Sequence, residues 1–308
     1  MRSAVVTGAN GMIGSALVRE LLANGSRVLA LVREGENNCV NLPQHPLLCV
    51  RTCGLGSLAA FQPSTDDVPF DVMYHFAWNG TFGSSRDDAY LQNDNLRYTL
   101  DAISLAARLG CRRFVGAGSQ AEYGITPPGQ KLSPATPTAP DTGYGIAKLA
   151  AGCLGGLHAA SLGIHFNWVR ILSVYGPAEK PHCLTMSTIL SLLRGQSVHF
   201  TKGEQLWDFL YCEDAARAFR LIGEKGVPGQ IYVLGSGQTI SLADAITTLC
   251  NAINPAARIG LGDLPYPQGQ RMYLCADISK LTEDTGFTPQ VSYPKGILQT
   301  IHRAKEQL

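Results

Sequence analysis

The chain has 308 residues, with 25 lysine and arginine residues against 24 aspartate and glutamate residues, a length that suits one domain with a subsidiary lobe. Its basic residues are scattered singly or in pairs, which argues against nucleic acid or an anionic membrane as a partner. The start of the chain lacks the pattern of a signal peptide and no stretch has the length of a membrane span, so a cytoplasmic protein is expected.

In the first half of the chain, short apolar runs bounded by turn residues alternate with helix-length periodic segments. This alternation predicts an α/β fold, with a parallel sheet covered by helices. The predicted strands are Ala4–Thr7, Arg27–Val32, Leu47–Arg51, Val72–Phe76, Arg113–Val115 and His165–Arg170. The predicted helices are Met12–Ala23, Asn95–Leu109 and Tyr144–Leu162. Between Ile125 and Gly143 the chain is rich in proline, threonine and glycine, which predicts a surface loop.

The second half has a looser pattern. Its predicted helices are Ser187–Leu193, Asp214–Ile222 and Leu242–Ile253, and its predicted strand is Gln230–Leu234. We therefore expect a first domain over residues 1–172 and a smaller lobe over residues 173–308. Segments near residues 206–218 and 229–236 are expected to return to the first domain.

The first predicted strand runs into a glycine-rich turn that opens the first predicted helix. Gly8 permits a tight turn, Gly11 removes a side chain where a pyrophosphate must approach, and Gly14 allows close packing of helix on strand. This context predicts dinucleotide binding; the alternative is a strand-to-helix turn that binds nothing. The residues of the predicted phosphate site are Thr7, Gly8, Asn10, Gly11, Met12, Ile13 and Gly14.

The end of the second predicted strand bears on the choice of cofactor. An acidic residue at that point accepts hydrogen bonds from the adenosine ribose of NAD(H). The chain has Val32 there, followed by Arg33, whose guanidinium suits the 2′-phosphate of NADP(H). The sequence thus favours NADP(H), with NAD(H) possible if Arg33 is a solvated charge and Glu34 takes the acidic role.

Tyr144 and Lys148 are four residues apart and therefore on one face of a predicted helix. A neighbouring cation lowers the pKa of a phenol, so Lys148, helped by an oxidised nicotinamide ring, is expected to make Tyr144 an acid/base group. Ser119 follows a strand and is expected to hydrogen-bond the reacting oxygen. The alternatives are a surface pair for the helix residues and a turn-capping role for Ser119.

Nine cysteines are spread along the chain without a C-x-x-C pair or a companion histidine at metal-ligand spacing. Their odd number and low density favour reduced thiols over a disulfide framework. No metal site is predicted.

Further motifs extend this pattern over nearly the whole chain. They are T-G-A-N-G-M-I-G at Thr7–Gly14, D-V-M-Y-H-F-A at Asp71–Ala77, N-L-R-Y-T at Asn95–Thr99, G-S-Q-A-E-Y-G at Gly118–Gly124, Y-G-I-A-K at Tyr144–Lys148, V-Y-G-P at Val174–Pro177, D-F-L-Y-C-E-D-A-A-R-A at Asp208–Ala218 and D-I-S-K-L at Asp277–Leu281. In order and spacing the chain resembles the extended short-chain dehydrogenase/reductases, also called the NAD-dependent epimerase/dehydratase family.

The resemblance implies a Rossmann-type, doubly wound parallel sheet that binds NAD(P), and a smaller C-terminal lobe that binds a nucleoside-diphosphate sugar. It places Ser119, Tyr144 and Lys148 at the family's catalytic positions. It also implies a homodimer formed through the helices Asn95–Leu109 and Tyr144–Leu162. The further cofactor-binding residues are Phe76, Ala77 and Asn95, and the expected substrate-binding residues are Trp78, Ser119, Gln120, Ser173 and Arg271.

Departures from the family pattern bear on the reaction. The family's 4,6-dehydratases carry an Asp-Glu pair after the serine or threonine, whereas this chain has Gln120 and Ala121, with Glu122 displaced by one place. Dehydration is therefore disfavoured. Ser173 stands where epimerases often have asparagine, and Trp207 where members often have arginine, so a different sugar pocket is expected.

The machinery suits two reactions. A 4-keto-6-deoxyhexose reductase, in which Tyr144 donates the proton, is slightly favoured, and a nucleotide-sugar 4-epimerase with bound NAD is nearly as well supported. Two alternatives are a non-catalytic dinucleotide-sensing protein and a reductase of small ketones.

Overall fold

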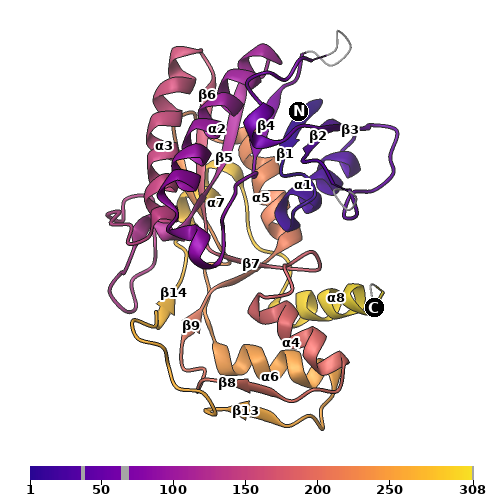
Figure 1. Ribbon diagram of the computed structural model, residues 1–308, viewed down its shortest axis with the longest axis vertical. Helices are drawn as coiled ribbons and strands as arrows, with labels where there is room; N and C mark the ends of the chain where they lie inside the picture. The colour runs from indigo at the N-terminus through magenta and orange to yellow at the C-terminus, as the bar shows by residue number, and fades with distance from the viewer. Residues whose placement is uncertain (36–38, 64–68, 307–308) are drawn as a thin grey trace.

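The computed structural model describes residues 1–35, 39–63 and 69–306. Its centre is a parallel sheet of seven strands in the order β11-β6-β5-β4-β1-β2-β3 (Figure 1). The strands are β1 (Ser3–Thr7), β2 (Arg27–Val32), β3 (Leu48–Thr52), β4 (Val72–His75), β5 (Arg113–Ser119), β6 (His165–Ile171) and β11 (Ile231–Leu234). The strand order reverses between β1 and β4, and such a point places a ligand crevice at the carboxyl ends of the strands.

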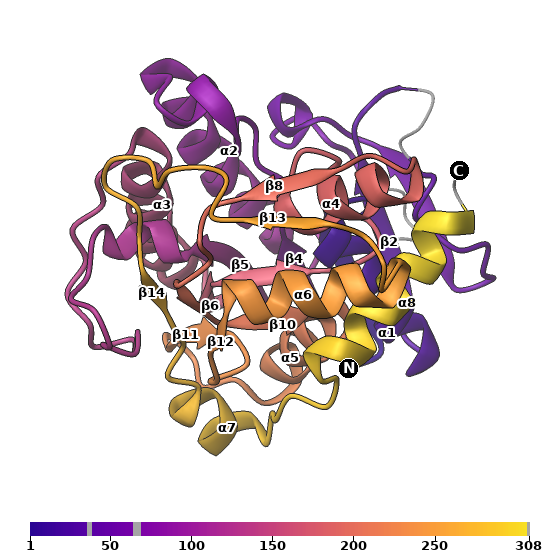
Figure 2. The same ribbon diagram turned by 90° about the horizontal axis from the view of Figure 1, so that it is seen from below.

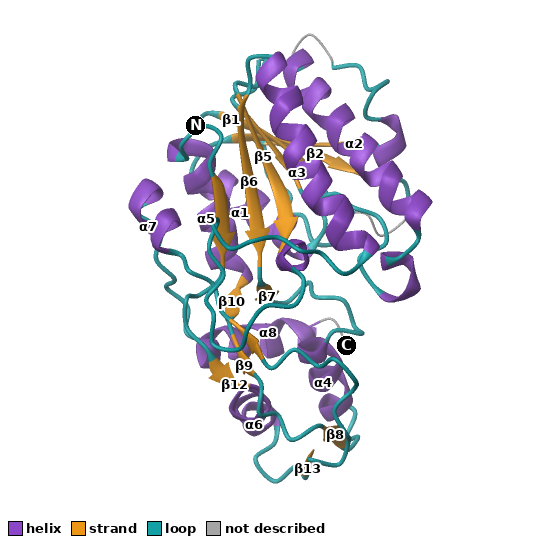
Figure 3. Cartoon of the chain, turned by 90° about the vertical axis from the view of Figure 1, so that its left-hand side faces the viewer, coloured by secondary structure: helices purple, strands orange, loops and turns teal. Residues whose placement is uncertain are grey.

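Helices cover both faces of this sheet, as Figure 3 shows. One face carries α1 (Met12–Ala23), α5 (Cys212–Lys225) and α7 (Ser279–Thr285), and the other carries α2 (Ala89–Arg108) and α3 (Gly143–Ser161). Successive strand residues point to opposite faces, so Val6 packs in the core under α1 and α5 while Val5 packs in the core under α2 and α3. The predicted Rossmann-type α/β fold is confirmed.

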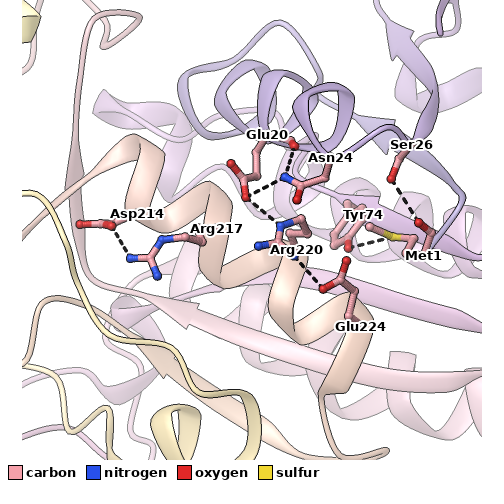
Figure 4. Close-up of polar contacts among 9 residues, drawn as sticks. All are labelled: Met1, Glu20, Asn24, Ser26, Tyr74, Asp214, Arg217, Arg220 and Glu224. Atoms are coloured by element: carbon pink, nitrogen blue, oxygen red, sulfur yellow. Dashed lines mark hydrogen bonds and ion pairs between the residues drawn. The ribbon is translucent and has the colours of Figure 1, made fainter.

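Polar side chains fasten α1 to α5 beside the sheet (Figure 4). Arg220 of α5 donates from Nε to Glu20 Oε1 of α1 at 2.7 Å and from Nη1 to Glu224 Oε2 at 2.7 Å. All three side chains are largely buried. The helix that follows the glycine-rich turn is thus anchored at its far end.

The remaining elements form a smaller lobe at the carboxyl end of the sheet, seen from below in Figure 2. Its helices are α4 (Leu184–Leu193), α6 (Leu242–Ile253) and α8 (Tyr293–Glu306). Its short strands are β7 (Ser173–Tyr175), β8 (Val198–Phe200), β9 (Leu206–Trp207), β10 (Phe209–Tyr211), β12 (Ile240–Ser241), β13 (Ile259–Leu261) and β14 (Tyr273–Leu274). β11 pairs with β6 in the large sheet, whereas β10 pairs only with β7.

Two elements of the first half extend beyond their predicted ends by more than one residue. β5 continues to Ser119 because it pairs with β6 as far as Ser119 opposite Ile171. Glycine is a poor strand former, but a Cβ at Gly116 would lie 2.4 Å from the Trp168 ring, so this position has room only for glycine. α2 begins at Ala89, six residues before the predicted start, because the Asp88 carboxylate accepts a hydrogen bond from Leu91 N at 3.1 Å and caps the helix.

Three further findings concern the cysteines, membrane spans and metal sites. All nine cysteines are free. Among the described residues, none of the helices is both long and apolar enough to cross a membrane. The described residues also hold no group of three histidine, cysteine, aspartate or glutamate side chains suited to a metal ion.

Candidate active site

The glycine-rich turn at the end of β1 has no room for side chains. Gly8 has a φ of 65°, and a Cβ there would lie 2.8 Å from Ala77 N. A Cβ at Gly14 would lie 2.2 Å from Gly8 O. Gly11 precedes α1, and no side chain caps the helix N-terminus. The backbone N–H groups of the first turn, which includes Met12 and Ile13, therefore suit an anionic group.

Two side chains fix this turn from either end. Thr7 Oγ1 lies 2.8 Å from His75 Nδ1 at the end of β4 and 3.4 Å from Ala77 N. The Asn10 side chain accepts a hydrogen bond from Asn41 N at 2.8 Å. His75 was not among the predicted site residues. Burial, reinforced by the charge of Lys148, lowers the pKa of His75 to about 3, so its ring is neutral at physiological pH.

A pocket of about 340 Å³ lies beyond the ends of β2 and β3. Its lining residues are Glu34, Thr52, Cys53, Gly54, Ser57, Ala60 and Phe61. Arg33 and Glu34 are both exposed, and of these two residues Glu34 belongs to the lining. Glu34, not Arg33, is therefore the charged side chain in the wall of this pocket.

The predicted catalytic residues meet where β5 ends and α3 begins. Ser119 ends β5, and its hydroxyl lies near the Tyr144 phenol. Thr142 caps α3 by accepting from Gly145 N at 3.1 Å, which fixes the first turn carrying Tyr144. Burial raises the pKa of the Tyr144 phenol above its usual value, against the lowering effects of the Ser119 hydroxyl and of Arg86. Tyr144 is thus a neutral proton donor at pH 7.

Lys148 lies one turn further along α3, and its ammonium contacts groups other than Tyr144. Its Nζ donates to Ala117 O at 2.6 Å and lies 3.6 Å from the centre of the Trp78 ring. Burial lowers the pKa of Lys148 to about 7, and the charge of Glu122 opposes that shift. The lowering of the Tyr144 pKa by Lys148, which the helical spacing predicts, is therefore weak in this arrangement.

The displaced acid Glu122 has a structural role. It lies in the 3₁₀-helix η4 (Gln120–Tyr123) and is fully buried. Its Oε1 accepts from Ser119 N at 2.8 Å and from Trp168 Nε1 at 2.9 Å, while Oε2 accepts from Arg170 Nε at 2.7 Å. Both carboxylate oxygens are thus occupied, and together they fix the backbone at Ser119.

The loop after β4 is pinned by side chains of α2. Asn95 donates from Nδ2 to Asn79 O at 2.8 Å and accepts from Asn79 N at 2.9 Å. Trp78 donates from Nε1 to Gln92 Oε1 at 2.9 Å, and its ring meets the Tyr144 ring edge-on at 6.0 Å. The Asn95 amide, predicted to contact cofactor, is therefore engaged with the loop. Phe76 packs edge-on against Phe219 of α5 at 4.6 Å.

Two of the predicted substrate residues, Ser173 and Arg271, belong to the smaller lobe, whereas Trp78, Ser119 and Gln120 belong to the large domain. Arg271 donates to Gln120 Oε1 and, at 2.5 Å, to Gly124 O. Trp207 donates from Nε1 to Ser173 Oγ at 2.6 Å. The Ser173 and Trp207 substitutions noted in the sequence are thus one hydrogen-bonded pair.

Ser173 and Trp207 also line a second pocket of about 340 Å³. Glu179 Oε2 and Gln205 Oε1 belong to its lining residues, are buried, and have no hydrogen-bond partner within the described chain. Burial raises the pKa of Glu179 to about 7. The pocket therefore combines aromatic walls with polar atoms that a ligand would satisfy.

The sheet, its glycine-rich turn and the Ser119–Tyr144–Lys148 group define a dinucleotide-binding α/β enzyme. A model of the NAD dependent epimerase/dehydratase family matches residues 4–235, and the chain belongs to this family. The predicted resemblance is confirmed.

Related proteins match this chain over nearly its full length. The chain is 28% identical over 318 residues to a dTDP-glucose 4,6-dehydratase of Streptomyces niveus, covering 96% of this chain and 91% of the relative. It is 26% identical over 317 residues to a UDP-glucose 4-epimerase of Mycolicibacterium smegmatis, covering 96% of each. The fold matches a UDP-glucuronic acid 4-epimerase from Bacillus cereus in complex with NAD, with a TM-score of 0.83, 22% identity and 99% of each chain covered.

Proposed function

We propose that the protein reduces the ketone of a nucleoside-diphosphate 4-keto-6-deoxyhexose, with Tyr144 as the proton donor. The observation that carries this proposal is the position of the Tyr144 phenol beside Ser119, at the end of β5. Burial raises the pKa of this phenol above its usual value, although the nearby Ser119 hydroxyl and Arg86 lower it. A neutral phenol beside a hydroxyl suits protonation of an oxygen that gains negative charge as hydride reaches its carbon.

The same residues supply the steps of the reaction. The reduced dinucleotide supplies the hydride when bound. The Ser119 hydroxyl orients the substrate carbonyl against Tyr144, which donates its proton to that oxygen. Lys148 stands one helical turn away, where its Nζ donates to Ala117 O and lies over the Trp78 ring that meets Tyr144 edge-on. Arg271 and the second pocket would hold the nucleoside diphosphate.

The residues present fit a dinucleotide. The turn around Gly8 and Gly14 leaves space only for glycine, and His75 Nε2 is buried without a partner in the described chain. We assign Thr7–Gly14 to the pyrophosphate, and Phe76, Ala77 and Asn95 to the wall of the cofactor cleft. The pocket at Glu34 would take the adenosine ribose.

The Glu122 contacts argue against dehydration. Elimination of water needs an extra acid and base beside the sugar. Gln120 and Ala121 carry no carboxyl group, and both oxygens of Glu122 are held by Ser119 N, Trp168 and Arg170. The dTDP-glucose 4,6-dehydratase relative therefore does not indicate the reaction of this chain.

A 4-epimerase is the second candidate, and the Glu34 pocket favours it. An acidic side chain there suits the ribose of an NAD that stays bound, as an epimerase requires. The UDP-glucose 4-epimerase relative and the NAD-containing neighbour also support this candidate.

A panel assay tests both candidates. The protein is incubated with NADH or NADPH and with nucleotide sugars and their 4-keto-6-deoxy forms. A reductase consumes one reduced cofactor for each product formed, whereas an epimerase yields product without net change of cofactor. Binding of UDP, CDP, dTDP and GDP is measured in parallel, since a reductase of small ketones would ignore all four. Absence of turnover with every nucleotide sugar would contradict the proposal.

The choice of cofactor gives a prediction at Glu34. Although Arg33 suits a 2′-phosphate, Glu34 lines the pocket, and we propose NAD(H) as the preferred cofactor. Glu34→Gln should weaken NAD(H) binding about tenfold, since hydrogen bonds to a charged group contribute about 1.5–3 kcal/mol, and should improve binding of NADP(H). Titration calorimetry with both cofactors checks this. The matched variant Arg33→Gln should leave NAD(H) affinity unchanged. If the wild-type protein bound NADP(H) more tightly than NAD(H), and Arg33→Gln lost this preference, Arg33 would be shown to bind the 2′-phosphate and the NAD(H) proposal would be wrong.

We also propose that the protein forms a homodimer through α2 and α3. Apolar side chains of α3 stand exposed on its outer face, with 72% of Leu157, 56% of Ile146 and 45% of Leu154 accessible, and Tyr90 of α2 is 88% exposed. A twofold dimer would cover them. Light scattering should therefore give twice the chain mass of 33.0 kDa, and Leu157→Asp should return it to the monomer value. A wild-type monomer would contradict the dimer.

A further inference from the structure

A second cation, Arg86, lies against the catalytic tyrosine. Its guanidinium carbon is 4.4 Å from the centre of the Tyr144 ring. Arg86 ends the 3₁₀-helix η3 (Gly83–Arg86) in the loop between β4 and α2, and its Nη1 donates to Thr81 O at 3.2 Å. A guanidinium over an aromatic face is attracted to it, and it keeps its charge at every working pH.

The backbone on either side of Arg86 is held in place. Gln92 of α2 donates from Nε2 to Ser85 O at 2.9 Å. Asp87 Oδ1 accepts from Gly143 N at 2.8 Å, at the residue before Tyr144. These contacts tie the loop both to α2 and to the beginning of α3. The backbone from which the Arg86 side chain extends over Tyr144 is therefore held by both helices.

Lys148 is a weaker source of charge for Tyr144 than Arg86. Its Nζ lies 5.8 Å from the Tyr144 ring centre, is hydrogen-bonded to Ala117 O and lies over the Trp78 ring. Burial lowers the pKa of Lys148 to about 7, so its charge is weakened near neutral pH. Arg86 is nearer and permanently charged.

The other groups around Tyr144 do not replace this charge. Ser119 of β5 offers a neutral hydroxyl. Glu122 of η4 is negative, but its carboxylate is paired with Arg170 at 2.7 Å. His75 of β4 is neutral at physiological pH. Among the described residues, no carboxylate forms an ion pair with Arg86, so its charge acts on Tyr144 without a counter-ion at contact.

We propose that Arg86 is a positioning residue for Tyr144: its cation holds the phenol ring and stabilises the phenolate that remains after proton transfer. This inference deepens the proposed function and rests on it. In ketone reduction, hydride from the reduced dinucleotide forms the new C–H bond, the carbonyl π electrons move to oxygen, and the O–H bond of Tyr144 breaks as its proton joins that oxygen. The phenolate so formed lies under the Arg86 guanidinium.

The test is the Arg86→Met variant, which keeps the length and apolar contact of the side chain but removes its charge. In the direction of alcohol oxidation Tyr144 must act as a base, so activity rises with pH as the phenol ionises. Loss of a nearby cation raises the pKa of Tyr144, and the rising limb of the kcat profile should move up by about one pH unit. At pH 7, kcat should fall about tenfold with little change in KM. Arg86→Lys should restore most of the profile.

Arg97→Met is the matched control, because the Arg97 guanidinium lies 4.7 Å from the Tyr98 ring on α2, away from Tyr144. It should leave the pH profile unchanged. A readout independent of turnover is the ultraviolet titration of phenolate. The titration curve of Tyr144→Phe is subtracted from that of the wild type, which leaves the curve of Tyr144 alone. The same subtraction, of Arg86→Met/Tyr144→Phe from Arg86→Met, gives the Tyr144 curve without the Arg86 charge. A higher midpoint for Tyr144 in the variant supports the inference even if no substrate is found. An equal midpoint in both pairs would overturn it, whether or not the wild-type protein reduces a nucleotide sugar.

Discussion

The Tyr144→Phe variant is expected to lose turnover by about 10²- to 10⁴-fold, the usual contribution of a positioned general acid. Only the phenol oxygen is removed, and the hydroxyl of Ser119 beside it stays in place. The glycine-rich turn and the Glu34 pocket are untouched, so affinity for the dinucleotide should stay the same. Single-turnover reduction, followed by loss of the reduced cofactor's absorbance, together with titration calorimetry, measures both quantities.

A second tyrosine serves as control for this experiment. Tyr232 is buried, accepts from Val227 N at 2.9 Å and donates to Asp284 Oδ2 at 2.9 Å, far from the cleft. Tyr232→Phe should lower stability slightly but leave turnover of the folded enzyme intact. If Tyr144→Phe turned over as fast as wild type, the acid/base role would be refuted. A wild-type protein that binds dinucleotide but turns over nothing would favour the dinucleotide-sensing alternative.

The Glu122→Ala variant is expected to have the largest effect on stability. It would leave Arg170, whose side chain is 5% exposed, without its carboxylate, and would remove the acceptor of Ser119 N and Trp168 Nε1. Breaking a buried ion pair by deleting one partner costs about 3–5 kcal/mol. Urea denaturation should show that loss in the free energy of unfolding.

Glu283→Ala is the matched control, since Glu283 is 72% exposed and pairs with Lys280 at 3.3 Å on the surface. Its effect should stay below about 1 kcal/mol. Glu122→Gln should be milder than Glu122→Ala, because the amide oxygen can still accept from Ser119 N. A loss of less than about 1 kcal/mol for Glu122→Ala would show that the Glu122 cluster does not stabilise the fold.

The sequence was most informative where the chemistry is local. Met12–Ala23, Arg27–Val32 and Leu242–Ile253 have the predicted bounds, because each is an apolar run or a helical hydrophobic period with turn residues at both ends. The glycine-rich turn was also predicted, because its function depends on glycines that lie close together in the sequence. The Tyr144–Lys148 pair likewise depends on helical spacing alone.

What escaped prediction depends on contacts between distant segments. The shortest strands, such as Leu206–Trp207, span too few residues to show a period. The position of Arg86 over Tyr144 requires the loop to be pinned by Gln92 and Asp87, and no local pattern encodes that. The sequence showed that Glu122 was displaced from the dehydratase position, but its partners Trp168 and Arg170 come from β6. The orientation of Lys148 toward Trp78 likewise could not be inferred from spacing.

The most direct test of the account follows the hydride itself. The wild-type protein is given a nucleoside-diphosphate 4-keto-6-deoxyhexose and NADH deuterated at either transferable position, and the sugar product is examined by NMR. We predict deuterium at C4 of the product from one of the two labelled cofactors, and no labelled product with Tyr144→Phe on the same timescale. A wild-type product that carries no deuterium from either cofactor would contradict the reductase proposal.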